Sequence, residues 1–307
     1  MHVHRPVLRS AHAALFALAI TAPLNNAVAQ APAQTAGPAL TVAADTSMRQ
    51  LIRLRDGSTV LGRIVQSWGD SARVESMAGL LTLRRSDVAS LKLVRTSSIH
   101  DGIYWPDDPN ATRLFFAPTA RMLKKGDGYL SNHWLFLMDG YKGVTDRFTL
   151  GGAMTLFPSD NFLKNNAYFI SPKVAITQSD RFNTAAGVWL GAAPFSDDEG
   201  SVNSFGIVYG VATWGGNDGA FTFGGGYGFA EGKAARNPMV MLGGTRRLSR
   251  RLSFVSENWL FPNTENPLVS AGIRTIGESV SWDLGFLTVL GTGTTIPVPW
   301  IGVAWKF

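Results

Sequence analysis

Large apolar and very small side chains alternate along most of the chain after residue 111, and few folds are compatible with this pattern. Residues 221–229 read FTFGGGYGF, and residues 281–286 read SWDLGF. Bulky residues occupy most alternate positions in both segments, and small or polar residues fill the positions between them. A period of two residues is that of a β-strand, whose successive side chains point to opposite faces of the sheet. We therefore predict an all-β fold.

About twelve such segments lie within residues 112–307, each 8 to 13 residues long and each ending at a cluster of turn-forming residues. The first two span 112–121 and 129–139. Membrane strands are tilted and need about 9–11 residues to cross a bilayer. In a soluble sandwich the face opposite the apolar one is polar, whereas here it is mostly small, which suits the crowded interior of a barrel surrounded by lipid. We expect an antiparallel transmembrane β-barrel of about 12 strands.

The last residues of the chain repeat the alternation and end on an aromatic side chain. Ile301, Val303, Trp305 and Phe307 form one face of this segment. The segment resembles the terminal strand of bacterial outer-membrane β-barrel proteins, whose C-terminal aromatic residue acts as an assembly signal. The resemblance implies a location in the bacterial outer membrane, contact with the lipid there, and recognition by the barrel-assembly machinery.

Residues 1–29 are typical of a secretory signal peptide. Arg5 and Arg9 precede an apolar run over 13–24, and Ala27-Val28-Ala29 matches a cleavage site. The apolar run is too short to cross a bilayer as a helix. Residues 30–47 are rich in Ala, Pro and Thr and predict a flexible linker. The chain has no Cys, which excludes disulfides, a thiolate nucleophile and a Cys-ligated metal.

Residues 48–95 contain five short alternating runs separated by turn signals such as Asp56-Gly57 and Gly69-Asp70. We expect a small five-stranded β-barrel here. The segment resembles SH3-like or Sm-like modules, which implies a fold but no ligand, and we place it in the periplasm, where it could have a partner. Its arginines alternate with acidic residues, so they predict a solvated surface rather than an RNA-binding one, and no nucleic-acid partner is expected.

Residues 96–111 form a linker that Pro106 and Pro109 stiffen, which predicts that the small domain stays close to the mouth of the barrel. With both termini in the periplasm, the connection 122–128 would face the outside, and no outer loop is long enough to form a plug. Four arginines, at positions 246, 247, 250 and 251, surround an inner turn. They could bind a carboxylate partner, bind acidic residues of the small domain, or form a solvated rim.

The inward face of the barrel is predicted to carry eight polar or charged candidates that line the lumen: Arg113, Arg121, His133, Lys173, Glu257, Arg274, Asp283 and Lys306. Arg or Lys facing lipid near the midplane would cost about 2–4 kcal/mol, so these groups are expected inside. One interpretation pairs the charges with each other, for example Arg274 with Asp283. The other counts five cations against two anions and predicts a modest preference for anionic solutes.

Three functions are compatible with these features. The sequence favours a narrow passive channel for small solutes, which would be a non-enzyme without a metal or cofactor. The second is a non-conducting structural or scaffold protein of the envelope. The third is an outer-membrane lipid hydrolase using Ser131 and His133, which lie on the same face of one predicted strand. A single His near a Ser is more often a hydrogen-bonding residue than part of a catalytic site.

Overall fold

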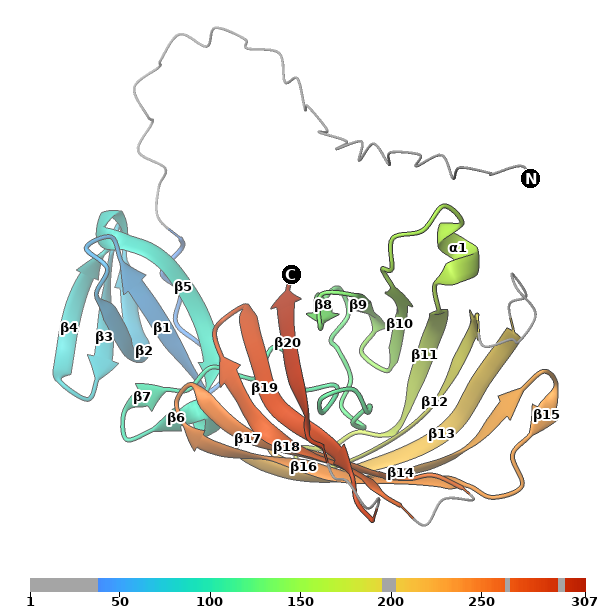
Figure 1. The fold of residues 1–307 in the computed structure, drawn as a ribbon. Coiled ribbons are helices and arrows are strands. Elements are labelled where there is room, and N and C mark those ends of the chain that lie inside the picture. The colour runs from blue at the N-terminus through green and yellow to red at the C-terminus, as the bar shows by residue number, and fades with distance from the viewer. Residues whose placement is uncertain (1–37, 195–202, 263–265, 292–295) are drawn as a thin grey trace, which may run out of the picture.

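A computed structural model describes residues 38–194, 203–262, 266–291 and 296–307 (Figure 1). The expected signal peptide at 1–29, and residues 30–37 of the expected linker, lie outside the described residues. Among the described residues, no helix has both the length and the apolar character needed to cross a membrane.

The first part of the chain forms a separate five-stranded antiparallel sheet, here called the N-terminal sheet. Its strands are β1 (Met48–Leu54), β2 (Thr59–Trp68), β3 (Ser71–Ser76), β4 (Gly79–Arg84) and β5 (Val88–Arg95), in the order β4-β3-β2-β1-β5. Ile52, Ile64 and Val88 are fully buried in its core. Leu40 packs against this core although it belongs to the expected flexible linker, because its side chain covers apolar surface that the five strands leave exposed.

Twelve antiparallel strands form a closed ring. They are β8 (Gly128–His133), β9 (Leu137–Thr145), β10 (Phe148–Thr155), β11 (Tyr168–Thr177), β12 (Phe182–Ala193), β13 (Asn203–Gly216), β14 (Gly219–Ala230), β16 (Met239–Ser249), β17 (Leu252–Leu260), β18 (Leu268–Ile276), β19 (Val280–Val289) and β20 (Val298–Lys306). Each pairs with the strand before it, and β20 pairs with β8, which closes the ring. The expected 12-stranded antiparallel barrel is confirmed.

Short elements connect these parts. Two-residue strands β6 (Ile99–His100) and β7 (Ile103–Tyr104) pair with each other between the N-terminal sheet and the barrel. Helix α1 (Phe162–Asn165) lies between β10 and β11, and the two-residue strand β15 (Lys233–Ala234) extends the edge of β14.

The barrel reaches twelve strands by a different division of the chain from the one predicted. Residues 112–121 form no barrel strand, and the segment 129–139 contains a turn that separates β8 from β9. At this turn Trp134 and Leu135 have φ values of +50° and +69°. Tight hairpin turns need such positive φ values and normally use Asn or Gly, so the sequence carries no signal for this turn.

The two ends of the barrel differ in the length of their connections. We call the end where β8 begins and β20 ends the near end, and the opposite end the far end. Near-end turns such as 146–147 and 217–218 are tight, whereas far-end connections such as 156–167 are longer. The connection 122–128 leads into β8 at the near end, where β20 also ends, so it does not lie at the end opposite the C-terminus as predicted.

The outer surface of the barrel is apolar and has an aromatic belt near each end. Aliphatic residues such as Ile170, Val208 and Ile301 are exposed in the middle zone. The near-end belt consists of Phe182, Trp214, Phe221, Phe254, Trp282 and Trp305, and the far-end belt includes Tyr168, Tyr227 and Phe286. The small residues alternate with these and face inward, as predicted. An apolar band between two aromatic belts is the surface of a barrel that spans a bilayer.

This orientation predicts how a charge affects stability at two depths. Leu284 lies in the middle of β19 and faces outward, and Leu290 lies just beyond the far end of the same strand. We expect Leu284→Arg to lower the free energy of unfolding in lipid vesicles by about 2–4 kcal/mol, and Leu290→Arg by about 0–1 kcal/mol. Urea titration of the two variants measures the difference, and equal losses would contradict the membrane placement.

Candidate functional site

The lumen is filled by a segment of the chain that precedes the first barrel strand. Residues 112–119, here called the lumen hairpin, fold back on themselves: the Thr119 amide donates to the Thr112 carbonyl at 2.9 Å, and the Leu114 amide donates to the Ala117 carbonyl at 2.8 Å. Arg113 and Pro118 form an isolated antiparallel bridge. Figure 1 shows this segment inside the curved sheet, between β7 and β8 in the chain.

Wall strands all around the ring contact the lumen hairpin and its flanks. Thr112 is bonded to Tyr129 of β8, and the amides of Ala120 and Leu123 donate to hydroxyls on β13 and β10. Leu114 and Phe115 are each 1% exposed and pack in one cluster with side chains of β12, β13, β16, β17 and β20. Since these strands occupy different sides of the ring, the segment is enclosed by the barrel.

Among the described residues of the lumen, the side chain of Arg274 on β18 donates the most hydrogen bonds. It is fully buried and donates to both carboxylate oxygens of Asp283, at 2.6 and 2.9 Å. These two residues face each other across neighbouring strands, and they form the ion pair that the sequence suggested. Arg274 also donates to Asp108 at 2.9 Å and to the Leu114 carbonyl at 2.5 Å. One guanidinium therefore joins the wall to the lumen hairpin and to the chain that leads into it.

Two further wall charges bind backbone groups of the same segment. Glu257 accepts hydrogen bonds from the amides of Phe116 and Ala117 at 2.8 and 2.9 Å. Lys173 donates to the carbonyls of Thr119 and Arg121, both at 2.9 Å. Burial of an ionised group is costly unless hydrogen bonds replace its hydration. The turn of the hairpin supplies these bonds to Glu257, and the end of the hairpin with its flank supplies them to Lys173.

The other predicted lumen residues have different surroundings. Arg113 belongs to the lumen hairpin itself and donates to the Phe115 carbonyl. Arg121 follows the hairpin and donates to the Gly216 carbonyl of β13 at 2.5 Å. Lys306 lies at the near-end rim, where it pairs with Asp127 at 2.9 Å and is about one-third exposed. The first two are therefore groups of the plugging segment rather than of the wall.

The charge balance of the lumen is closer to neutral than the sequence count suggests. The sequence placed Arg247 at a rim turn rather than in the lumen and gave no signal for Asp108 and Asp139, because the inward position of all three depends on the register of the strands and on the path of the plugging segment. Among the described residues, the lumen holds five cationic side chains and four carboxylates: Arg113, Arg121, Lys173, Arg247 and Arg274 against Asp108, Asp139, Glu257 and Asp283.

Ser131 and His133 do not form a nucleophile and base couple in the described part of the chain. Both bond Asp139 of β9 instead: Ser131 donates to one carboxylate oxygen at 2.5 Å, and His133 Nε2 lies 2.9 Å from the other. All three side chains are buried inside the barrel. Because the serine and the histidine each bond the same carboxylate and not one another, the hydrogen bond by which a histidine activates a serine is missing from the described structure.

At the near end, the linker before the lumen hairpin is bound to the barrel rim. Arg247 and Arg250 donate to the carbonyls of Pro106 and Tyr104, at 2.7 and 3.0 Å. Asp107 accepts a 2.6 Å hydrogen bond from Asn217. Two of the four rim arginines thus bind backbone of the linker, which was not among the expected partners, and the linker holds the N-terminal sheet beside this end of the barrel.

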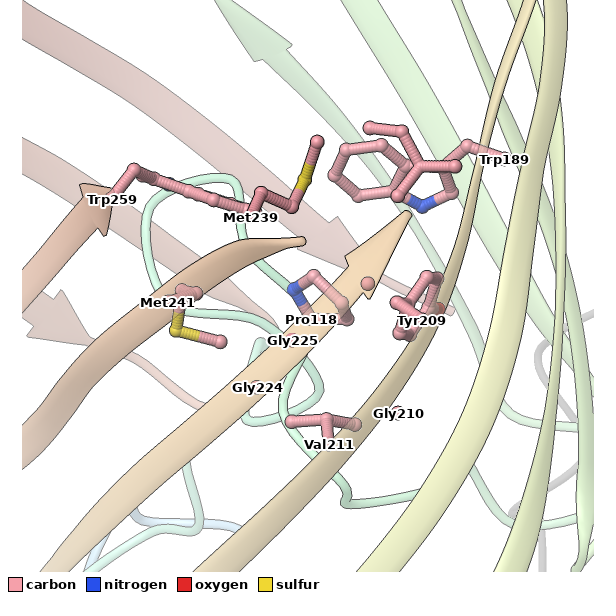
Figure 2. Close-up of a pocket in the computed structure, with 12 residues that line it drawn as sticks. Pro118, Trp189, Tyr209, Gly210, Val211, Gly224, Gly225, Met239, Met241 and Trp259 are labelled. Carbon is pink, nitrogen blue, oxygen red and sulfur yellow. The ribbon is translucent and has the colours of Figure 1, made fainter. Parts of the chain in front are cut away.

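Beyond the lumen hairpin, toward the far end, the lumen is apolar. Figure 2 shows a recess between Pro118 of the hairpin and the wall, lined by Trp189, Tyr209, Met241 and Trp259 among others. It contains about 310 Å³ of space not occupied by atoms, part of it open to solvent. We call this space the apolar recess. The lumen therefore has a polar part that holds the hairpin and an apolar part between the hairpin and the far end.

No protein-family model matches the chain, and no curated protein matches it. Solved structures match at low similarity. A NanC porin shares 12% identity, with 59% of this chain and 99% of that chain covered and a TM-score of 0.41. The loop L8 deletion mutant of OmpT, an outer membrane protein of Vibrio cholerae, shares 11% identity over 85% of this chain and 96% of its own, with a TM-score of 0.34. OmpF of Salmonella typhi in complex with daunomycin shares 9% identity over 85% and 95%, with a TM-score of 0.32.

The buried Arg274 pair predicts a large loss of stability. We expect Arg274→Leu to lower the free energy of unfolding by about 3–5 kcal/mol, because Asp283 remains buried without its cation. The double variant with Asp283→Leu should recover part of this loss. Lys306→Leu is the matched control: its ion pair with Asp127 is exposed, so the loss should stay below about 1 kcal/mol. Chemical denaturation measures all three, and similar losses for Arg274→Leu and the control would contradict the assignment.

Proposed function

We propose that this protein is a bacterial outer-membrane β-barrel with its N-terminal sheet in the periplasm. The apolar outer surface between two aromatic belts supports a place in the membrane. The tight near-end turns, compared with long far-end connections such as 156–167, support a near end that faces the periplasm. The outward face of β20, with Ile301, Val303 and Trp305, and the adjoining Phe307 are suited to recognition by the barrel-assembly machinery. The N-terminal sheet, which we propose to be SH3-like, is available to a periplasmic partner.

We further propose that the barrel is a narrow passive channel that the lumen hairpin closes in this conformation. The observation that carries the proposal is how the hairpin is held. Arg274, Glu257 and Lys173 bind its turn and its flanks through hydrogen bonds to backbone groups. Water can replace such bonds when the hairpin moves, and the charged groups would then line an open, hydrated lumen.

Solute preference follows from the same residues. On the described wall strands the lumen charges balance, with three cations against three carboxylates, and the small cationic excess comes from Arg113 and Arg121 of the plugging segment, against Asp108. A weak preference for anions therefore requires that this segment stays at the pore when the hairpin is displaced.

The two other functions predict different behaviour. A structural envelope protein with a permanently filled lumen predicts no conductance from any variant. A lipid hydrolase predicts that Ser131→Ala abolishes an activity on phospholipid or lipid A. Ser131 is bonded to Asp139 and buried in the lumen, which favours a structural role for it. We therefore propose a protein without enzymatic activity, metal or cofactor.

Planar-bilayer recordings test the channel proposal. We expect brief, rare openings from the wild-type protein and long stepwise openings from a variant in which a short Gly-Ser linker replaces residues 112–119. The variant Glu257→Leu, which removes the acceptor for two hairpin amides, should increase the open fraction several-fold. Lys306→Leu is the control, because its ion pair does not touch the hairpin. A salt gradient across the bilayer gives the ion preference.

The recordings distinguish the alternatives clearly. If only the variant with the Gly-Ser linker in place of residues 112–119 opens, this segment closes the wild-type barrel. Silence from all variants, with the barrel folded by circular dichroism, would contradict the channel and favour the structural protein.

A further inference from the structure

The apolar recess has the composition of a ligand site rather than of a packed core or a water-filled pore. Trp189 and Trp259 stand on opposite sides of it, and Met239 and Met241 line the wall between them (Figure 2). Opposite the hairpin, β14 contributes Gly224, Gly225 and Gly226 to the wall, and the two that have the inward parity, Gly224 and Gly226, have no side chains to fill the space. Aromatic and thioether groups around a wall of glycine create an apolar space with room for a ring.

One polar atom in this apolar surface has no partner. Trp189 is 6% exposed, and its indole Nε1 donates no hydrogen bond to any described residue. Figure 2 shows this nitrogen on the edge of the ring that faces Tyr209 and Pro118, across the recess. Buried indole N–H groups normally find an acceptor, so this donor marks a place where a ligand acceptor fits.

The size of the recess limits the ligand. The space of about 310 Å³ includes a part that is open to solvent, so the enclosed part is smaller than most small-molecule sites. We therefore limit the ligand to a single aromatic ring with a short substituent, part of which stays at the open side of the recess; an oligosaccharide or peptide is too large. A charged group would lose its hydration here without gaining a partner, because the wall charges lie in the polar part of the lumen and are bonded there.

We propose that the apolar recess binds a small neutral aromatic compound that carries one hydrogen-bond acceptor, with the ring between Trp189 and Trp259 and the acceptor on the Trp189 indole. The compound would rest on Pro118, so the site lies directly against the lumen hairpin that closes the barrel. This identifies a solute class for the channel proposed above and rests on that function for its role in transport. Binding itself does not depend on conductance.

Two glycines on paired strands give a matched pair of variants. A Cβ at Gly224 would lie 3.2 Å from the flexible terminal methyl of Met241, so Gly224→Val places its side chain in the recess with a small adjustment. Gly210 also borders the recess, but only with its backbone, because it has the outward parity of the exposed Val208 and Trp214. A Cβ there meets no atom within 4 Å, and Gly210 is paired with Gly225 of β14. Gly210→Val therefore adds the same group on the lipid side of the wall at nearly the same depth.

The test uses the full chain in lipid nanodiscs and three fluorinated probes: para-fluoroacetophenone, fluorobenzene and para-fluorobenzoate. Fluorine NMR line broadening, after subtraction of empty nanodiscs, gives the affinities. We expect the ketone to bind about fivefold more tightly than fluorobenzene, which is the effect of one typical hydrogen bond. The carboxylate should bind most weakly. Gly224→Val should weaken ketone binding at least about tenfold, and Gly210→Val should leave it unchanged.

Trp189→Phe separates the hydrogen bond from the shape of the site. It retains an aromatic ring in the wall, so fluorobenzene should bind as it does to the wild type, while the preference for the ketone should disappear. This variant also keeps the proposal testable if Gly224→Val does not fold.

Several results would overturn the proposal: equal binding to wild type and Gly224→Val, tightest binding of the carboxylate, or a ketone preference that survives in Trp189→Phe. Saturable binding without conductance from any hairpin variant would overturn the channel and support the site. Conductance without saturable binding would overturn the site and support the channel.

Discussion

Backbone amides and carbonyls that face hydrocarbon have no water to bond, and this constraint governs the whole barrel. Strands in a membrane must therefore pair on both edges, which the ring achieves when β20 pairs with β8. Closure in turn creates an interior that is shielded from lipid and only partly open to water. Charged groups placed there, such as Arg274 and Glu257, need partners, and the barrel wall alone supplies only some of them.

The lumen hairpin and the charged wall stabilise each other for this reason. A buried turn exposes backbone groups that no sheet can pair, and buried charges lack the water that would otherwise solvate them. Glu257 bonds two amides of the turn, and Arg274 and Lys173 bond carbonyls of the hairpin and its flanks. This complementarity explains how polar and charged residues lie inside an apolar barrel without an open pore. It also divides the lumen, because beyond the hairpin the wall becomes aromatic and apolar.

The predicted fold was correct in class and strand number, but two errors compensated in the count. Residues 112–121 were predicted to be a strand from their length and an assumed alternation, although Pro118 and the pair Phe115 and Phe116 do not fit a strand that faces lipid on one side. The turn at Trp134 and Leu135 was missed because neither residue is a usual turn former. Asp139 was overlooked in the site because this turn places it, through the β8 and β9 register, opposite Ser131.

The sequence by itself determined that this chain forms a barrel with large apolar side chains outside and small side chains inside. The period of two residues is a local property, which each strand displays independently of its partners. The sequence also indicated the Arg274 and Asp283 pair, since both residues have the inward parity of adjacent strands. Only the tertiary structure decided what fills the lumen. The partners of Glu257 and Lys173 are backbone groups from more than 50 residues away along the chain. Such contacts depend on where the chain enters the ring, which no local pattern encodes.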